Sequence, residues 1–385
     1  MDAMPPDGGV VVPAGSRVFD ADVLHVVELT VAAADLPKLD DNNNLERVRA
    51  TISLDGEVVT NAGLRKKGST SRRPLSEKAG FTIKFNEFVP GQKLDGLKKL
   101  VLDNAAQDPS FLTGHISYEV YRRAGLPAPR TSHAVLRFNG VDKGIFVLEE
   151  ATNEDYLKKH FGNGGGNLYE GPWDFPKGAA AADLKDEVSE GRTRDDLTAL
   201  TAVVMNTPDA QFATQLAAHL DVERFIDNYA VEMVAALWDN YAFVAWNFYL
   251  YHVPNGRFVM LTHGINWPCC NISGAPNWKA DLDPLNIHSD PWQAGPGFPP
   301  GRLCERIDAI PALAAQFSTA LKRVARDAFD VPTLLARIDR AAATLHSRPL
   351  TGASAADLAG FDAEVGKVRT FVRNRKAYLT TRLGL

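Results

Sequence analysis

Trp238-Asp239-Asn240-Tyr241, then Asn247-Phe248-Tyr249-Leu250-Tyr251, then His263-Gly264-Ile265-Asn266 is the stretch that decides how this chain is interpreted. Polar side chains interrupt apolar runs there, and the turn signal Pro254-Asn255-Gly256 predicts a β-hairpin that joins residues 242–251 to residues 257–261. A carboxylate, a carboxamide and a third polar group around one hairpin form the arrangement that a phosphoryl-transfer site needs. The third group is Asn266, where such a site uses a carboxylate to hold metal.

Composition sets broad limits on the function. The chain has 385 residues, 45% hydrophobic and 23% charged, which is typical of a globular protein with one large core or two lobes. The net charge of -5 gives no general indication of nucleic acid or an anionic membrane as a partner. We expect no membrane span and no signal peptide, because long apolar runs and a basic start are missing.

Neither the N-terminal segment nor the cysteines determine the cellular compartment. Residues 1–20 are rich in Pro, Gly and Asp and predict a flexible tail or linker, which fits a mature secreted form as well as a cytosolic start. Three cysteines, Cys269, Cys270 and Cys304, allow one disulfide at most. Buried thiols or a bridge to Cys304 are favoured over a metal site, because adjacent cysteines lack the usual zinc spacing.

The pattern of apolar residues predicts an α+β fold with two lobes. Residues 21–150 form a β-rich first lobe with one helix between Asp108 and Gly125, and residues 151–385 form a mainly helical second lobe that carries the hairpin. Asp55-Gly56 and Asn139-Gly140 predict tight hairpin turns in the first lobe. Strands are expected at residues 24–32, 48–54, 58–64, 81–85, 97–102, 134–138 and 144–149, and helices at residues 197–204, 212–220, 222–237, 303–329, 331–345 and 355–383.

The segment from Gly63 to Arg73 is a candidate anion site. It places five cations, two glycines and three hydroxyls in eleven residues between two predicted strands. Glycine amides, hydroxyl donors and cationic heads are the groups that bind phosphate oxygens. A solvated basic loop is the alternative, and the segment alone does not separate the two.

Four further charged residues are candidates for nucleotide binding. Strand alternation places Lys84 on the face opposite Phe81, Ile83 and Phe85, next to the basic segment. A helix carboxylate normally holds such a lysine, and Glu119 is the available one. Glu149 and Glu150 end a predicted strand at the expected edge of a cleft between the lobes. For each of these residues an ordinary solvated side chain is the alternative.

Several motifs in one order give the chain a specific resemblance. From about Val27 to Leu285 it resembles the spore-coat CotH family of atypical, secreted or surface-associated protein kinases. The matching pieces are Gly63-x-Arg65-x-Lys67-Gly68-Ser69-x-Ser71, the strand around Lys84, Leu100-x-Leu102-x-Asn104, Asp108-Pro109-Ser110, Gly125-Leu126-Pro127-x-Pro129, Gly144 with Glu150, Phe161-Gly162, Leu168-Tyr169, Trp238-Asp239-x-Tyr241, Asn247-x-Tyr249-Leu250-Tyr251 and His263-Gly264.

The resemblance implies a protein-kinase-like fold that uses ATP with Mg²⁺ or Mn²⁺ to phosphorylate Ser or Thr hydroxyls of a protein. It also implies a secreted or cell-surface location, with a cytoplasmic location as the alternative. By the same resemblance, Asp239 corresponds to the catalytic base and Asn247 to a metal ligand. Lys84 corresponds to the phosphate-pairing lysine, and Arg65, Lys67, Ser69 and Ser71 to the phosphate-binding segment.

The sequence departs from the family pattern at Asn266, where similar sequences have a metal-binding aspartate. An asparagine offers an amide oxygen but no negative charge, so we expect weakened phosphoryl transfer. A catalytically inactive pseudokinase that binds nucleotide or protein is the main alternative, and transfer of another part of the nucleotide is a third. Asp281, Asp283 and Asp290 follow in the sequence and are candidates to replace the lost carboxylate, although solvated acidic turn residues around Pro284 and Pro291 are the simpler interpretation.

Overall fold

The computed structural model describes residues 13–185, 192–265, 280–289 and 299–385. Its contacts divide the chain into two compact units, each built from separate stretches of sequence. The first unit comprises residues 1–111, 129–151 and 340–361, and the second comprises residues 112–128, 152–339 and 362–385. A single boundary at residue 150 was expected. In the structure, residues 112–128 belong to the second unit and residues 340–361 belong to the first.

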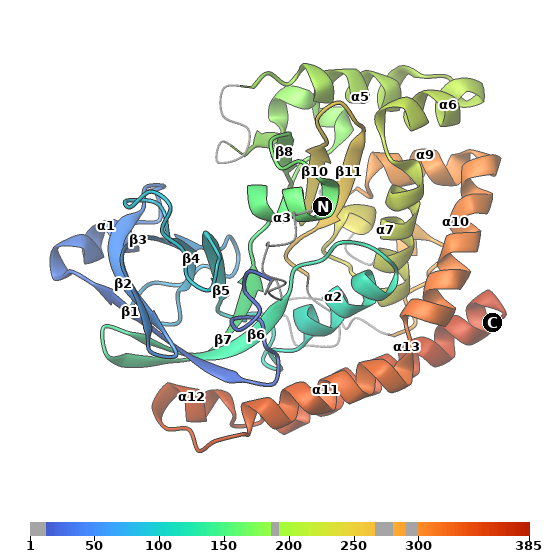
Figure 1. Cartoon of the computed structure of the whole chain (residues 1–385). Helices are drawn as coiled ribbons and strands as arrows, with labels where there is room; N and C mark the ends of the chain where they lie inside the picture. Colours follow the sequence, from blue (N-terminus) through green and yellow to red (C-terminus); the bar gives the residue numbers. More distant parts are fainter. Residues whose placement is uncertain (1–12, 186–191, 266–279, 290–298) are drawn as a thin grey trace, which may run out of the picture. The chain divides into compact units, whose positions relative to one another are not determined.

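The first unit is a closed β-barrel, drawn in blue to green in Figure 1. Its strands follow the order β1-β2-β3-β4-β5-β7-β6, and parallel pairing of β1 with β6 closes the barrel. The strands are β1 (Leu24–Val31), β2 (Val48–Leu54), β3 (Glu57–Lys67), β4 (Gly80–Lys84), β5 (Lys99–Asp103), β6 (Thr131–Phe138) and β7 (Val141–Glu150), and the unit also holds η1 (Ala33–Asp35), α1 (Leu36–Asp40) and α12 (Gly352–Asp357). The β-rich first lobe is thus confirmed.

Both predicted hairpin turns are present. Asp55 and Gly56 have φ of 50° and 89°, and Asn139 and Gly140 have φ of 47° and 81°. Two successive residues with positive φ make the type of turn whose twist matches that of paired strands. The amide side chain of Asn139 also bonds both backbone groups of Val31, with distances of 2.8 and 3.1 Å. This turn therefore links β6 and β7 to β1.

Alternation along β4 fills the barrel as the sequence predicts. Phe81 and Ile83 are buried, whereas Thr82 and Lys84 on the other face are partly exposed. Phe81 stacks on Phe138 with ring centroids 5.6 Å apart. Apolar side chains from all seven strands join this core.

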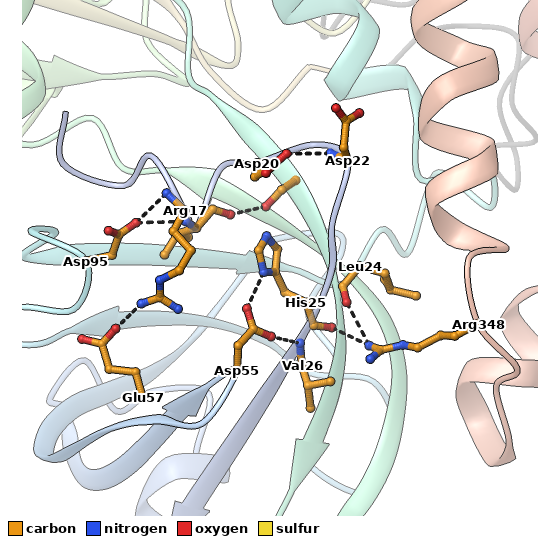
Figure 2. A network of polar contacts seen from close by, with 12 residues as sticks. Arg17, Asp20, Asp22, Leu24, His25, Val26, Asp55, Glu57, Asp95 and Arg348 are labelled. Atoms are coloured by element: carbon orange, nitrogen blue, oxygen red, sulfur yellow. Dashed lines mark hydrogen bonds and ion pairs between the residues drawn. The ribbon is translucent and has the colours of Figure 1, made fainter. Parts of the chain in front are cut away.

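Residues 13–20, within the expected tail, are packed on the barrel. Val18 is fully buried, and the carboxylate of Asp95 accepts hydrogen bonds from the backbone amides of Arg17 and Val18 at 2.9 and 3.0 Å. The guanidinium of Arg17 pairs with Glu57, as Figure 2 shows. The described part of this segment therefore belongs to the barrel.

The late segment 340–361 also belongs to the barrel. Arg348 donates to the carbonyls of Leu24 and His25 at 3.0 and 3.2 Å (Figure 2). Helix α12 lies against β7 (Figure 1), and its last residue, Asp357, accepts a hydrogen bond from the Ile145 amide at 2.7 Å. Residues far apart in the sequence thus complete one unit.

The second unit is mainly helical, as expected for the second lobe. Its four-stranded sheet has the order β11-β10-β8-β9, and helices α7 and α10 pack side by side (Figure 1). The elements are α2 (Thr113–Arg123), α3 (Glu154–Phe161), β8 (Asn167–Glu170), η2 (Phe175–Lys177), η3 (Ala179–Ala181), β9 (Asp183–Leu184), α5 (Asp195–Asn206), α6 (Asp209–His219), α7 (Val222–Ala235), α8 (Tyr241–Val244), β10 (Phe248–His252), β11 (Phe258–Thr262), η4 (Ile287–Ser289), α9 (Arg302–Ala309), α10 (Pro311–Arg323), the π-helical turn η6 (Val324–Ala328), α11 (Val331–Leu345, which contains the boundary after Asp339) and α13 (Phe361–Leu383).

Several expected elements are wrong in extent. The predicted helix 303–329 is divided because Pro311 begins a new helix, α10. The predicted helix 355–383 is divided at Gly360, whose φ is 81°. Residues 242–244, predicted as strand, form the short helix α8, which ends at Ala245 with a left-handed backbone. No helix in the described ranges is long and apolar enough to cross a membrane.

Candidate functional site

Asp239 lies shortly after helix α7, beyond a point where the backbone turns sharply. The helix ends at Ala235, and Ala236 adopts a left-handed backbone with φ of 55° and ψ of 48°. The Leu237 amide then donates to the Glu232 carbonyl at 2.9 Å. Because these bonds close the last turn, Asp239 leaves the helix in a defined direction.

Asn247 holds Asp239 directly. Its amide nitrogen donates to the backbone oxygen of Asp239 and to Oδ2 of the same residue, both at 2.8 Å. Its backbone has φ of 49°, and its carbonyl accepts from the Asn240 side chain and the His263 amide at 3.1 Å each. Two predicted site residues are therefore brought together.

The oxygen donors here fit a divalent cation in part. The Asn247 amide nitrogen faces Asp239, so the donor that remains for a metal is Oδ1. Gly264, with φ of 59°, leaves room beside that atom, since a Cβ at this position would lie 3.2 Å from it. Carboxylate and amide oxygens are the ligands that Mg²⁺ prefers. Within the described ranges no three His, Cys, Asp or Glu side chains form a metal cluster, and Asn266 lies outside those ranges.

Only the second half of the basic segment is a loop, because β3 extends to Lys67. Arg65 and Lys67 belong to β3, where they pair with Thr82 and Gly80 of β4, so the expectation that the whole segment lies between strands is wrong. The Arg65 guanidinium donates to the Leu45 carbonyl at 3.1 Å, and Lys67 forms an ion pair with Asp103. Strand β3 therefore continues past the predicted end at residue 64, because its hydrogen bonds to β4 include Arg65 and Lys67.

The remaining loop, from Gly68 to Arg73, retains positive charge. Gly68 has φ of 107°. Ser69 is exposed and Ser71 is partly exposed. Arg72 donates to the carbonyls of Gly68 and Asn42 at 2.9 and 2.8 Å, and Arg73 donates to the Thr70 carbonyl at 3.1 Å. Among the described residues no carboxylate forms an ion pair with Arg72 or Arg73, and anion binding by this loop stays a prediction.

Lys84 and Glu119 each have an ion-pair partner within their own unit. Lys84 pairs with Glu87 at 2.9 Å in the barrel. Glu119, on α2 of the helical unit, pairs with Arg122 at 3.1 Å and with Arg337 at 3.6 Å. The pairing of Lys84 with Glu119 stays a prediction.

The two glutamates at the end of β7 differ in environment. Glu150 is buried, and its carboxylate takes two side-chain hydrogen bonds from Arg130, at 2.6 and 3.0 Å. Glu149 is partly exposed and lies opposite Val101 and Thr131 in the sheet. Glu150 thus has a clear structural partner in the barrel.

Comparison with known proteins identifies the family. The model of the CotH kinase protein family matches residues 64–379, which is most of the chain. The chain belongs to this family. It is 21% identical over 315 residues to the inner spore coat protein H of Bacillus subtilis (strain 168), and that match covers 77% of this chain and 82% of the relative.

One solved structure is similar to this chain, but more weakly than the sequence relative above. The Helicobacter pylori proinflammatory kinase CtkA matches with a TM-score of 0.36 and 10% sequence identity, over 88% of this chain and 91% of that one. A match at this score does not define the fold, which rests on the barrel and the helical unit described above. Family membership shows that this CotH-family chain is a kinase-like protein.

A buried acid that the sequence analysis did not predict lies beneath the turn of the candidate site. Glu232 on α7 is 1% exposed, and its carboxylate accepts from the Asn228 side chain at 2.8 Å and from the Ala242 amide at 2.7 Å. Burial raises its pKa to about 8, despite the two hydrogen bonds. The available signal was a glutamate between Val231 and Met233 on a helix that is apolar on most sides.

A second missed acid is Glu170 on β8. Its carboxylate lies 3.3 Å from both the His263 ring and the Tyr249 hydroxyl, and it forms an ion pair with Lys185. Burial would raise its pKa, but His263 and Lys185 hold the pKa well below its usual range. Tyr249 lies in β10 two residues after Asn247, and His263 follows β11, so this charged cluster is built on the same hairpin.

The candidate replacement acids do not supply an obvious metal ligand. Both carboxylate oxygens of Asp283 accept from Arg382 on α13, at 3.0 Å each. Asp281 is exposed, and Asp290 lies outside the described residues, as do Cys269 and Cys270. Cys304 is buried and forms no disulfide within the described part of the chain.

Proposed function

We propose that this chain is an atypical kinase that transfers a phosphoryl group from ATP to Ser or Thr hydroxyls of a protein. The observation that carries the proposal is the pair of 2.8 Å hydrogen bonds by which Asn247 fixes Asp239. A base that accepts the hydroxyl proton must be held in position, and the Asn247 amide holds both the backbone and the carboxylate of Asp239. Membership of the CotH kinase family supports the reaction class.

Each candidate residue then has a role. Asp239 accepts the proton from the substrate hydroxyl, and Asn247 and Asn266 are the residues that would hold Mg²⁺ or Mn²⁺. The cation, when bound, neutralises charge on the nucleotide phosphates. The proposed nucleotide-binding residues are Arg65, Lys67, Ser69, Ser71, Lys84, Glu119, Glu149 and Glu150, of which Lys84 pairs with the phosphates.

Transfer is expected to be slow because Asn266 carries no charge. Loss of a unit charge about 4 Å from the cation, at an effective dielectric of about 20, removes about 4 kcal/mol. If all of that acts in the transition state, the rate falls by roughly a thousandfold. Assays must therefore detect weak turnover.

The test is incubation of the purified chain and protein substrates with γ-labelled ATP and Mg²⁺ or Mn²⁺, for the wild type and for Asp239→Ala. We expect weak labelling that falls by at least about a hundredfold in the variant, the range for loss of a general base. Asp195→Asn, at the start of α5 in the same unit, is the control and should label like the wild type. Equal labelling of wild type and Asp239→Ala would sink the proposal. A mass gain of AMP instead of phosphate would replace it with nucleotidyl transfer.

A pseudokinase is the second candidate, and Asn266 is the observation that favours it. A nucleotide-binding pseudokinase should melt at a higher temperature with ATP but transfer no label. At about 100 times the dissociation constant, ligand stabilises a protein by about 2.7 kcal/mol. An unchanged melting midpoint with ATP and metal would leave only a protein-binding role.

We also propose a spore-coat or cell-surface location, with a protein as the partner. The support is the name of the Bacillus subtilis relative, an inner spore coat protein. Cell fractionation with an antibody against the chain is the measurement. Recovery only from the cytoplasmic fraction would contradict this location.

A further inference from the structure

A fully buried arginine lies behind the candidate catalytic turn. Arg375 on α13 is 0% exposed, and its guanidinium donates to four backbone carbonyls. The acceptors are Val234 at 2.8 Å, Met233 at 2.5 Å, Ala280 at 2.9 Å and Leu282 at 2.5 Å. One planar side chain therefore joins two segments that are far apart in the sequence.

Such a residue is costly to bury. Arginine is almost never fully buried without a partner, because moving its charge out of water costs several kcal/mol unless other groups compensate. Here the compensation comes from carbonyl dipoles. Met233 and Val234 lie in the last turn of α7, where carbonyls lack helical partners and carry the negative end of the helix dipole. Burial lowers the pKa of Arg375 to about 9, which leaves it charged at neutral pH.

The two clamped segments flank the candidate site in the sequence. Val234 is five residues before Asp239, and the helix between them ends in the left-handed turn at Ala236. Ala280 and Leu282 come after Asn266 and precede Asp283. Arg382, seven residues beyond Arg375 on the same face of α13, holds the Asp283 carboxylate. Helix α13 thus fixes the chain before and after the candidate metal residues.

We propose that Arg375 is a positioning residue that holds the end of α7, and hence Asp239, against the segment 280–282. Its effect on transfer rests on the proposed function. The clamp itself concerns only the local stability of the two segments, so it is testable in a chain without activity.

The experiment compares Arg375→Lys and Arg375→Met with the matched control Lys376→Met, by amide hydrogen exchange and by Mn²⁺ binding. Lys376 is the neighbouring cation on α13, and its ammonium also caps carbonyls, those of Ala325 and Phe329 near η6 at 2.5 and 3.1 Å. The control therefore removes a similar interaction at another place in the same unit.

For both Arg375 variants we expect exchange in residues 237–247 and 280–285 to rise by about tenfold or more. Lys376→Met should raise exchange at residues 325–329 and leave 237–247 unchanged. If the wild type binds Mn²⁺, the Arg375 variants should bind it more weakly than the control. Absence of Mn²⁺ binding in the wild type would count against the proposed function and leave the exchange result to decide the clamp.

Unchanged exchange at 237–247 in a folded Arg375→Lys or Arg375→Met chain overturns the proposal. So does the same rise in this segment for Lys376→Met, because the effect would then be general loosening. If neither variant folds, Arg375→Ala is refolded with dilute guanidinium chloride and, separately, with methylammonium chloride. Selective recovery with guanidinium supports the clamp, and equal recovery or none rejects it.

Discussion

At the scale of single residues, Asn266 sets the expected strength of metal binding. We predict that Asn266→Asp raises Mn²⁺ affinity and any transfer rate, by up to roughly a thousandfold for the rate, because it restores a full negative charge near the cation. Titration with Mn²⁺ and a labelled-ATP assay measure the two effects. Asn286→Asp, which adds the same charge elsewhere in the helical unit, should change neither. If Asn266→Asp also leaves both unchanged, this hairpin is not the metal site.

Glu232 gives a prediction about pH. Its pKa is about 8 in the folded chain and near 4.5 when unfolded, so the folded state binds the extra proton between these values. Stability from this group is therefore present at low pH and falls as the pH rises from about 4.5 to about 8. In Glu232→Gln this fall should be absent. Its free energy of unfolding in denaturant, relative to that of wild type, should therefore increase with pH in that window, by at most about 1.4 kcal/mol per pH unit.

The control for Glu232 is Glu223→Gln, an exposed acid on the same helix. It should leave the pH dependence of unfolding as in wild type. A parallel pH dependence for wild type and Glu232→Gln would contradict the raised pKa, because Glu232 would then bind protons equally in the folded and unfolded states.

At the scale of elements, the Asn139-Gly140 turn is expected to support closure of the barrel. Asn139→Ala removes two hydrogen bonds to Val31 and places alanine at a positive φ. At about 0.5–1.5 kcal/mol per hydrogen bond and about 1–2 kcal/mol for the backbone, the loss should be about 2–5 kcal/mol in urea unfolding. Asn255→Ala, at an exposed turn with φ of 57°, should lose only the backbone part. Equal losses would mean that the Val31 contact adds nothing.

Elements were predictable where their signals are local. Asp55-Gly56 and Asn139-Gly140 predicted two hairpins because their turn chemistry depends on adjacent residues. Alternation around Lys84 also followed from a short pattern, whereas the hydrogen bonds between Asn247 and Asp239 were not predicted. Helix α8 was missed because the Ala242 amide is held by Glu232, ten residues away, and that contact has no local signature.

At the scale of the whole chain, the unpredicted contacts are those of longest range. Lys78 in the barrel is mostly buried, with a pKa lowered by burial, and its ammonium lies 2.6 Å from Asp357, 279 positions later. Arg375 likewise finds its acceptors through tertiary packing. A sequence pattern shows which residues are charged, but the partner of a buried charge depends on how the complete chain folds.

Truncation after Asp339 is predicted to destabilise both units. The barrel would lose Arg348 and Asp357, and the helical unit would lose Arg375. We expect hydrogen exchange to rise in β1 and β7 as well as at the end of α7. Truncation after Leu383, which removes two exposed residues, is the control and should leave exchange unchanged. A barrel that keeps its protection after truncation at Asp339 would show that segment 340–361 is dispensable.

The discontinuous barrel has a consequence for synthesis on the ribosome. All seven strands have been translated by Glu150, but Arg348 and Asp357 follow roughly two hundred residues later. At about 5–20 residues per second, the nascent barrel waits roughly 10–40 s for its last contacts. During that interval the His25 and Leu24 carbonyls and the Ile145 amide lack their final partners, so this is the period in which a chaperone would have most to protect.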